Sequence, residues 1–261
     1  MQHQFTSTTH LKRAALTLLA LIMTCATAWA DSITYIDENG QTQTVDATQI
    51  TSETSRLNGG NWYYVSGTVN CPDDELYLMQ ENGTHNLILC DDATLTISNI
   101  EQDSQKFARL SVYGQSGGTG KLNVGDEYIV KAIFNCELTV NGGEVTLTGG
   151  QHHFQGCGTN HNVVFNGGKL TATGKQYGIG GNTTINATSG WINASKYGGS
   201  VTIAEGKYMK DETGRCYTGT LTDAEKAAAA GKTLQPATQT EYLNYYMFGG
   251  GNGLQNNPYV I

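Results

Sequence analysis

Neighbouring carboxylates are the residues of this chain that would most readily support chemistry. Asp91 and Asp92 follow an alternating strand-like run, and two further acidic groups occur at residues 73–75 and 126–127. Acidic clusters bind calcium, and paired carboxylates act as general acid and base on glycosidic bonds. No basic residue stands in a recognisable pairing with them. We expect acidic corners that keep the protein soluble; the enzyme alternative is a polysaccharide lyase or glycosidase that uses Asp91 and Asp92.

Residues 151–161 (QHHFQGCGTNH) gather histidine and cysteine, which are side chains that suit zinc. His152 and His153 would point to opposite faces of an extended chain, so at most one of them can join Cys157 and His161. No established ligand spacing connects the four residues. We expect a polar loop between two repeats, and we assign no metal and no other cofactor.

Aromatic rings beside amide side chains are common platforms for sugars. Trp191 alternates with Ile192, which predicts that the indole faces outward when the isoleucine faces a core. We take Trp191, Tyr177 and Tyr197 as candidate carbohydrate-binding residues. The alternative is an aromatic stack packed along the protein. Trp62, in an aromatic run near the N-terminus, is expected to cap the core instead.

Catalytic motifs give no support for an enzyme. His-Glu-x-x-His does not occur, and the Gly-x-Ser-x-Gly match at residues 114–118 (GQSGG) lies in a glycine-rich run between strands of a repeat. That run, at residues 117–122, also lacks the Lys-Ser or Lys-Thr of a phosphate-binding loop. We therefore assign no catalytic residues and expect a protein that is not an enzyme. The formal charge of −8 comes without a basic stripe, which argues against nucleic acid as a partner.

A repeated unit would hold these side chains in place. Residues 138–150 (LTVNGGEVTLTGG) and 163–175 (VVFNGGKLTATGK) each contain an alternating apolar run, an Asn-Gly-Gly corner and a second alternating run. Weaker copies flank them. Matching glycines stand 23, 25 and 22 residues apart by subtraction of their positions, at Gly120, Gly143, Gly168 and Gly190. That spacing is typical of one coil of a solenoid.

Stacked coils bury what a single coil cannot. The alternation puts apolar side chains on one face of each short strand, and stacking encloses these faces in one core. Asn-Gly-Gly supplies the left-handed backbone that sharp corners need. The predicted fold is all-β: a right-handed parallel β-helix, or solenoid, with an N-terminal cap and one short C-terminal helix. An antiparallel sandwich of hairpins is the alternative, because Asn-Gly also favours hairpins.

The N-terminus has the pattern of a signal peptide over residues 1–30. Lys12 and Arg13 precede an apolar run, and Ala28-Trp29-Ala30 offers a small-x-small cleavage site. No other stretch approaches the roughly 18 apolar residues of a membrane span. We expect no membrane span and a secreted or cell-surface location.

The remaining chain divides into four parts. Residues 31–66 are expected to form a strand-rich cap, and residues 67–215 the coils. Residues 216–240 hold a short helix and linker; the helix is opened by the capping box Thr222-Asp223-Ala224-Glu225. Residues 241–261 are expected to begin with a Tyr-rich strand and to lead into a further domain if the chain continues.

Five cysteines follow the leader: Cys71, Cys90, Cys136, Cys157 and Cys216. An exported protein can keep disulfides, and Cys71 with Cys90 and Cys136 with Cys157 are separated by 19 and 21 residues by subtraction, close to one coil. The alternative is that all five are small buried thiols, because an odd count leaves at least one unpaired.

Several segments resemble secreted, repeat-rich surface proteins of gut Bacteroidetes and β-helical modules described as carbohydrate-binding. The resemblance covers most of residues 31–235 and is carried by SITYID at 32–37, GQSGGTGKL at 114–122, YGIGG at 177–181, LTDAE at 221–225 and AGKTL at 230–234. It implies a surface or extracellular binding or adhesion module, with a polysaccharide or host glycan as partner, and no catalytic residues. A structural stalk that presents another domain is the third hypothesis.

Overall fold

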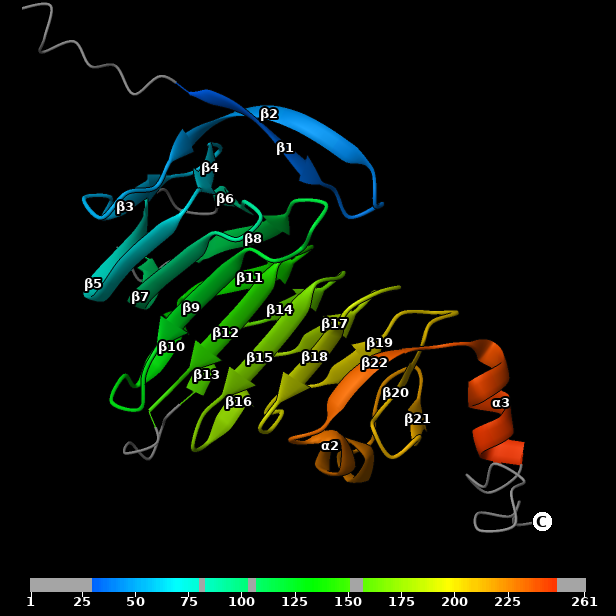
Figure 1. Cartoon of the computed structure of the whole chain (residues 1–261). Coiled ribbons are helices and arrows are strands. Elements are labelled where there is room, and N and C mark those ends of the chain that lie inside the picture. The colour runs from blue at the N-terminus through cyan, green and yellow to red at the C-terminus, as the bar shows by residue number, and fades with distance from the viewer. Residues whose placement is uncertain (1–29, 80–82, 103–106, 151–156, 248–261) are drawn as a thin grey trace, which may run out of the picture.

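The computed structural model of the chain describes residues 30–79, 83–102, 107–150 and 157–247. It is built mostly of strands, which wind into a β-solenoid of about 5 turns (Figure 1). The predicted all-β parallel β-helix is therefore confirmed. Residues 1–29 and 248–261, which include most of the predicted signal peptide and the chain end, lie outside the described residues.

Each turn passes along a nine-stranded sheet and then along a thirteen-stranded sheet. The nine-stranded sheet contains β1 (Asp31–Ile36), β2 (Thr42–Gln49), β4 (Trp62–Val65), β6 (Thr84–Leu89), β8 (Ala108–Gly114), β11 (Cys136–Val140), β14 (Val163–Phe165), β17 (Thr183–Ile185) and β19 (Val201–Ile203). The coil strands of the second sheet are β3 (Arg56–Asn58), β5 (Thr68–Met79), β7 (Thr94–Gln102), β9 (Lys121–Gly125), β10 (Lys131–Phe134), β12 (Glu144–Thr148), β13 (Cys157–Thr159), β15 (Lys169–Thr173), β16 (Tyr177–Ile179) and β18 (Trp191–Ala194). Three closing strands, β20 (Tyr208–Lys210), β21 (Cys216–Tyr217) and β22 (Thr233–Ala237), complete it.

The spacing of the glycines in the sequence equals the number of residues between stacked positions on successive coils. Glu144 pairs with Lys121 and Lys169, and Lys169 pairs with Trp191, so each of these residues follows one of the spaced glycines. The N–H of Trp191 donates to the carbonyl of Gly168 on the preceding coil at 3.0 Å. Inward side chains such as Val145 and Leu170 stack in the same register and are fully buried. Alternation thus produces one continuous core, as predicted.

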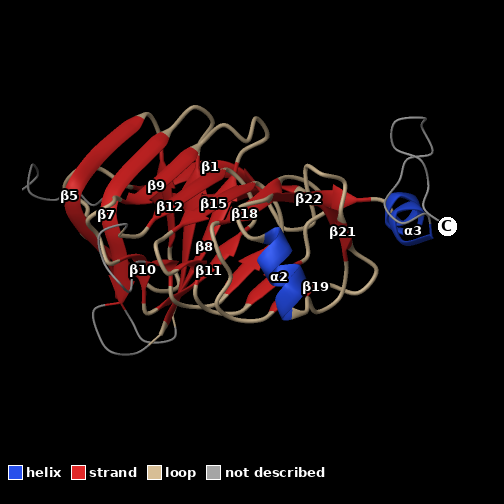
Figure 2. Ribbon diagram, turned by 90° about the horizontal axis from the view of Figure 1, so that it is seen from below, coloured by secondary structure: helices blue, strands red, loops and turns tan. Residues whose placement is uncertain are grey.

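The end of the solenoid after β19 is closed by antiparallel strands and a short helix. β22 pairs antiparallel with β18 and with β20, and β20 pairs antiparallel with β21. The predicted helix is present as α2 (Asp223–Ala229), with the Thr222 and Glu225 capping box formed. Ala229 and Leu234 are buried in the main core. Figure 2 shows α2 lying across this end of the coil.

A second helix, α3 (Gln239–Met247), occupies the segment where a Tyr-rich strand was predicted, so that prediction is wrong for residues 241–247. The hydroxyl of Thr238 accepts from the N–H of Glu241 at 3.2 Å, and the Glu241 carboxylate accepts from the N–H of Thr238 at 2.7 Å. These two bonds form a capping box. Its carboxylate also pairs with Lys210, which ties the helix to β20.

The predicted disulfides are not formed, because Cys71, Cys90 and Cys136 are free thiols. Cys71 lies in β5 of the thirteen-stranded sheet, whereas Cys90 follows β6 in the nine-stranded sheet. The local coil is 26 residues long, from Thr68 to its partner Thr94, so a spacing of 19 does not bring two cysteines onto neighbouring rungs. The alternative of unpaired thiols holds for the described cysteines.

Asp211 organises the turn between β20 and β21. Its side chain is 4% exposed, and it accepts hydrogen bonds from the N–H of Thr213 at 2.8 Å, the N–H of Arg215 at 3.1 Å and the hydroxyl of Tyr217 at 2.8 Å. Burial opposes ionisation of this carboxyl, but the hydrogen bonds outweigh it, so the pKa of Asp211 lies below its ordinary value.

We expect Gly190→Ala to destabilise the protein by at least about 3 kcal/mol, because the residue is left-handed and a Cβ there would lie 1.8 Å from the Gly168 carbonyl oxygen. Gly206→Ala is the matched control: φ is +71° there, but no atom lies within 4 Å of the new Cβ, so only about 1 kcal/mol is expected. Urea unfolding of both variants measures the difference. Equal losses would contradict the close stacking of coils.

We expect Asp211→Asn to reduce stability near neutral pH and to flatten its dependence on acid. A carboxyl whose pKa is lowered on folding stabilises the protein above its unfolded pKa of about 3.9, and that stabilisation is lost as the pH falls through the folded value. Thermal midpoints of the wild type and the variant between neutral and acidic pH test this. Parallel curves would show that Asp211 does not contribute through ionisation.

Candidate functional site

A row of asparagines runs along the outer side of the nine-stranded sheet, where its strands end. Val140, Phe165 and Ile185 stack in register and face the core. The next residue on each coil is an asparagine that faces outward: Asn141, Asn166 and Asn186. We call these three residues the asparagine ladder.

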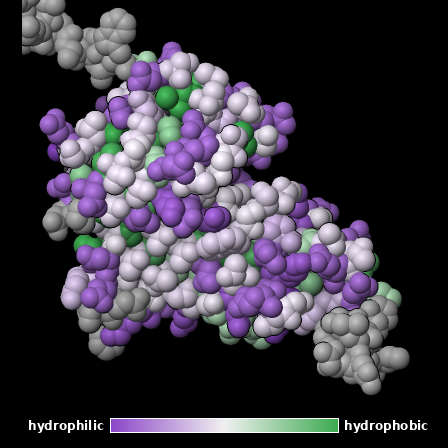
Figure 3. Space-filling view, viewed as in Figure 1, coloured by the Kyte–Doolittle hydropathy of each residue, from purple (hydrophilic) through white to green (hydrophobic). Residues whose placement is uncertain are grey.

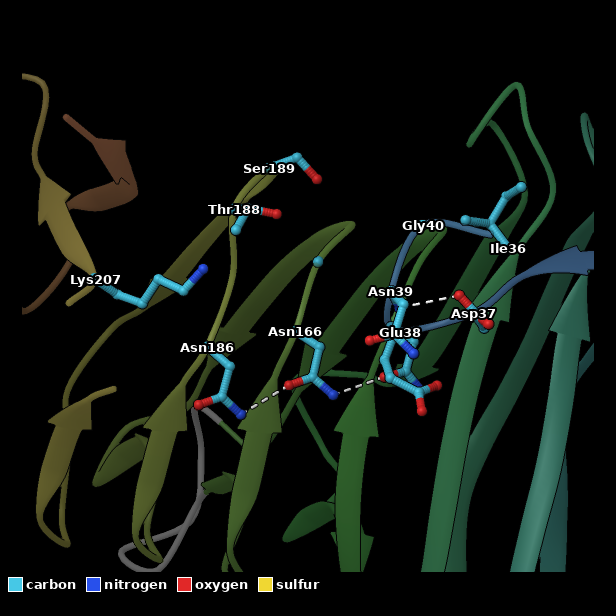
Figure 4. Close-up of a pocket in the computed structure, with 12 residues that line it drawn as sticks. Ile36, Asp37, Glu38, Asn39, Gly40, Asn166, Asn186, Thr188, Ser189 and Lys207 are labelled. Atoms are coloured by element: carbon cyan, nitrogen blue, oxygen red, sulfur yellow. Dashed lines mark hydrogen bonds between the residues drawn. The ribbon is translucent and has the colours of Figure 1, made fainter. Parts of the chain in front are cut away.

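The ladder is held by side-chain hydrogen bonds between coils (Figure 4). The Asn166 Nδ2 donates to Asn141 Oδ1 at 2.7 Å, and the Asn186 Nδ2 donates to Asn166 Oδ1 at 2.9 Å. All three side chains are half-buried, so each keeps a surface toward solvent. Because each amide has more donors and acceptors than the ladder uses, the row can bind further polar groups.

The preceding part of the same row is apolar and is covered by the β1–β2 hairpin. Ile88 pairs with Tyr113 on the next coil. Because Val112 pairs with Val140, Tyr113 is in turn in register with Asn141. Tyr64 and Ile88 are buried there with Ala47 of β2. The Gln115 Nε2 donates to the Thr34 carbonyl at 3.0 Å, which fixes β1 across the coils. The hairpin therefore packs on the side of the solenoid.

Three rings join the hairpin to the coils. Trp62 lies 4.6 Å from Tyr35 and 5.1 Å from Tyr113, and Tyr35 lies 5.0 Å from Tyr113, measured between ring centroids. The expectation that Trp62 caps the core is wrong: it lies in this outer cluster, while its neighbour Tyr63 faces the core. Tyr64 donates to the Asp31 carboxylate beside the cluster. The pKa of Tyr64 is raised to about 12, mainly by burial and secondly by this hydrogen bond.

The hairpin turn ends above the start of the ladder and closes one end of a groove. The cavity is about 590 Å³. We call it the asparagine groove; it is lined by Ile36, Asp37, Glu38, Asn39, Gly40, Asn141, Asn166, Gly167, Asn186, Thr188, Ser189 and Lys207. The outline of the molecule is indented on this side, between the hairpin and the later coils (Figure 3). The site thus combines residues about 170 positions apart, from the hairpin turn to the last coils.

One wall of the groove is negatively charged. The Asp37 carboxylate accepts from the N–H groups of Gln41 at 2.8 Å and Asn39 at 3.0 Å, and from Gln43 Nε2 at 2.9 Å. The bond from Gln41 and those from Gln43 and Asn39 hold the pKa of Asp37 below its ordinary value. The groove therefore presents carboxylates, amides and hydroxyls, which are groups that hydrogen-bond polyols without reacting with them.

Asp91, proposed above for the enzyme alternative, lies outside this groove and serves a corner. Its carboxylate accepts from the N–H of Gly117 at 2.9 Å on the next coil. The N–H of Asp92 donates to the Thr119 hydroxyl at 2.8 Å, and Asp92 has a left-handed φ of 61°. These contacts explain the acidic pair as a structural link between coils.

The three aromatic candidates do not form one platform. Trp191 is half-buried on the outer side of β18, as its alternation with the buried Ile192 predicted. Tyr177 is half-buried and its ring lies 5.2 Å from Lys196 Nζ. Tyr197 is only 5% exposed and packs in the main core, so it has no ring face to offer. Tyr177 and Tyr197 line one smaller cavity of about 260 Å³ beside α2, and Trp191 is not among its lining residues.

The candidate metal ligands can be followed only in part. His152 and His153 lie outside the described residues, as does the side chain of Cys157. His161 is half-buried and its ring contacts Phe107 edge to face at 4.9 Å. Burial and the nearby Lys131 lower the pKa of His161. Within the described ranges, no group of three His, Cys, Asp or Glu side chains could hold a metal ion.

The ladder and the groove were not recognised in the sequence. Asn-Gly-Gly by itself predicts a corner, and Asn141 and Asn166 occupy the same place in successive repeats. A polar residue that recurs at one coil position is the available signal, because the register then stacks the copies. The docking of the hairpin has no local signal at all.

We expect Trp62→Ala to loosen the hairpin without unfolding the coils, because it removes one of the three rings of the outer cluster. A loss of about 2 kcal/mol should appear as faster amide exchange in β1 and β2. Trp191→Ala is the control, since Trp191 lies in the other sheet. Unchanged exchange in the first variant, or equal acceleration in both, would contradict the packing described.

Comparisons with known proteins assign no function to this site. No family model, curated protein or solved structure matches the chain. Neither described helix is long and apolar enough to cross a membrane. The chemistry of the asparagine groove therefore rests on its own side chains.

Proposed function

We propose that the protein is a secreted or cell-surface binding module without catalytic activity, and that its asparagine groove binds carbohydrate. The observation that carries this proposal is the asparagine ladder beneath the hairpin turn. Amide side chains offer a donor and an acceptor side by side, which suits the hydroxyl groups of sugars. The sequence pattern of a signal peptide and the resemblance to β-helical carbohydrate-binding modules support the same proposal.

Rigidity is the second reason to favour binding at this place. The ladder stands at the ends of stacked strands, and its amides are held by each other at 2.7 and 2.9 Å. A site on rigid elements loses little conformational freedom when a ligand binds. The hydroxyls of Thr188 and Ser189 extend the polar lining along the corner of the β17 coil. A glycan could therefore contact several coils at once.

Binding is favoured over catalysis by what the groove contains. Its two acidic side chains, Asp37 and Glu38, are adjacent on the turn, so they do not flank the ladder from two sides. A glycosidase places its carboxyl groups on opposite sides of the bond to be cleaved. The Asp37 carboxylate is also engaged by the hydrogen bonds of its own turn.

We expect Asn166→Ala to weaken glycan binding about tenfold or more, because Asn166 bonds to both neighbouring asparagines. Asn123→Ala is the matched control, since Asn123 also faces outward but lies on β9 of the other sheet. A glycan array on the purified wild type identifies the ligand, and titration of both variants measures the loss.

Each polysaccharide that binds should also be assayed for products. Saturable binding without new reducing or unsaturated ends is the expected result. Product formation would show that the protein is an enzyme and would contradict the proposal. Equal losses of affinity in the two asparagine variants, or no binding to any glycan, would contradict carbohydrate binding at this groove.

A further inference from the structure

Two side chains of opposite charge face the asparagine groove from its two ends. Glu38 stands on the hairpin turn, and Lys207 extends from the far side toward Asn186 (Figure 4). Within the described part of the chain, neither the Glu38 carboxylate nor the Lys207 ammonium has a hydrogen bond or an ion pair. The two charges are therefore available to a ligand.

Lys207 differs in this respect from the lysines around it. Lys210 pairs with Glu241, Lys226 pairs with Asp223 at 2.9 Å, and Lys232 pairs with Glu212 at 3.3 Å. The half-buried Lys207 is instead aimed along the groove. At the opposite end, Asp37 adds a second negative charge to that of Glu38. The groove is thus negative at the hairpin turn and positive at the last coil.

The asparagine ladder separates these charges. From Asn141 to the coil of Lys207 is a distance of three coil steps, or about 14 Å at about 4.8 Å for each step. Among the described residues no ion pair joins Glu38 to Lys207, so the two ends do not neutralise each other. A ligand that spans the ladder meets both ends.

We infer that the groove takes a zwitterionic oligosaccharide, with an ammonium group beside Glu38 and Asp37, an acidic group beside Lys207, and sugar hydroxyls on the asparagine ladder. This inference rests on the proposed carbohydrate binding and adds the class of glycan and its direction. A neutral glycan would cover the Glu38 carboxylate and the Lys207 ammonium without supplying an opposite charge to either. A glycan that carries charges of only one sign would leave one of these two groups covered and unpaired. The charge pattern selects against both.

The test uses one trisaccharide of hexosamine, hexose and hexuronate in four forms. The amine is free or N-acetylated, and the carboxylate is free or methyl-esterified, so length and linkage stay constant. Calorimetric titration of the purified protein should rank the zwitterion first, with about tenfold or greater affinity over the doubly masked form. Raising the salt concentration should reduce that difference.

Two variants assign the charges. Glu38→Gln should remove only the gain from the free amine, and Lys207→Met only the gain from the free carboxylate, by about threefold to tenfold each. Because the two sites are far apart, the losses should combine additively in free energy. Glu205→Gln and Lys121→Met are the controls, since both side chains are exposed and neither lines the groove. Unchanged thermal midpoints show that the variants remain folded.

The outcomes separate this inference from the proposed function. Equal binding of all four forms, lost in Asn166→Ala, would overturn the zwitterion and leave carbohydrate binding in place. The same would follow if Glu38→Gln or Lys207→Met weakened all four forms equally. No binding of the four forms, together with no ligand on a glycan array, would overturn the proposed function itself.

Discussion

The backbone register between successive coils is the constraint on which the rest of this structure depends. Each coil hydrogen-bonds to the next through parallel strands, so a residue type that recurs in the sequence becomes a row in space. Inward rows form the core, in which Val140, Phe165 and Ile185 follow each other. The outward row that bears the asparagines follows from the same hydrogen bonds, because each asparagine is the next residue after one of these three.

The outward row also explains where the hairpin lies. Its first members are apolar, and β1 and β2 cover them through the cluster of Tyr35, Trp62 and Tyr113. The row becomes polar at Asn141, and there the hairpin turns back. A change in side-chain polarity along one row therefore sets the boundary between a buried contact and an open groove. The groove is a consequence of packing as much as of the residues that line it.

The coils were predictable from the sequence because their signals are local and repeated. Gly168 and Gly190 recur at the spacing that stacking requires, since a side chain at Gly190 would strike the preceding coil. The sequence does not predict α3, because the tyrosines after Glu241 favour strands, whereas the capping box of Thr238 and Glu241 begins a helix. The hairpin contact joins residues 81 positions apart, Gln115 and Thr34, and no short-range pattern encodes it. The disulfide prediction failed because coil length varies along the chain.

Glycan binding at the asparagine ladder is tested most directly by the response of the asparagine side-chain amides to a glycan, measured by nuclear magnetic resonance with the Nδ2 signals assigned. A glycan bound in the asparagine groove should shift the signals of Asn141, Asn166 and Asn186 together, with one saturation curve, while those of Asn123 and Asn193 on the other sheet stay unchanged. Shifts confined to the surroundings of Trp191 or Tyr177, with the asparagine ladder unaffected, would contradict it.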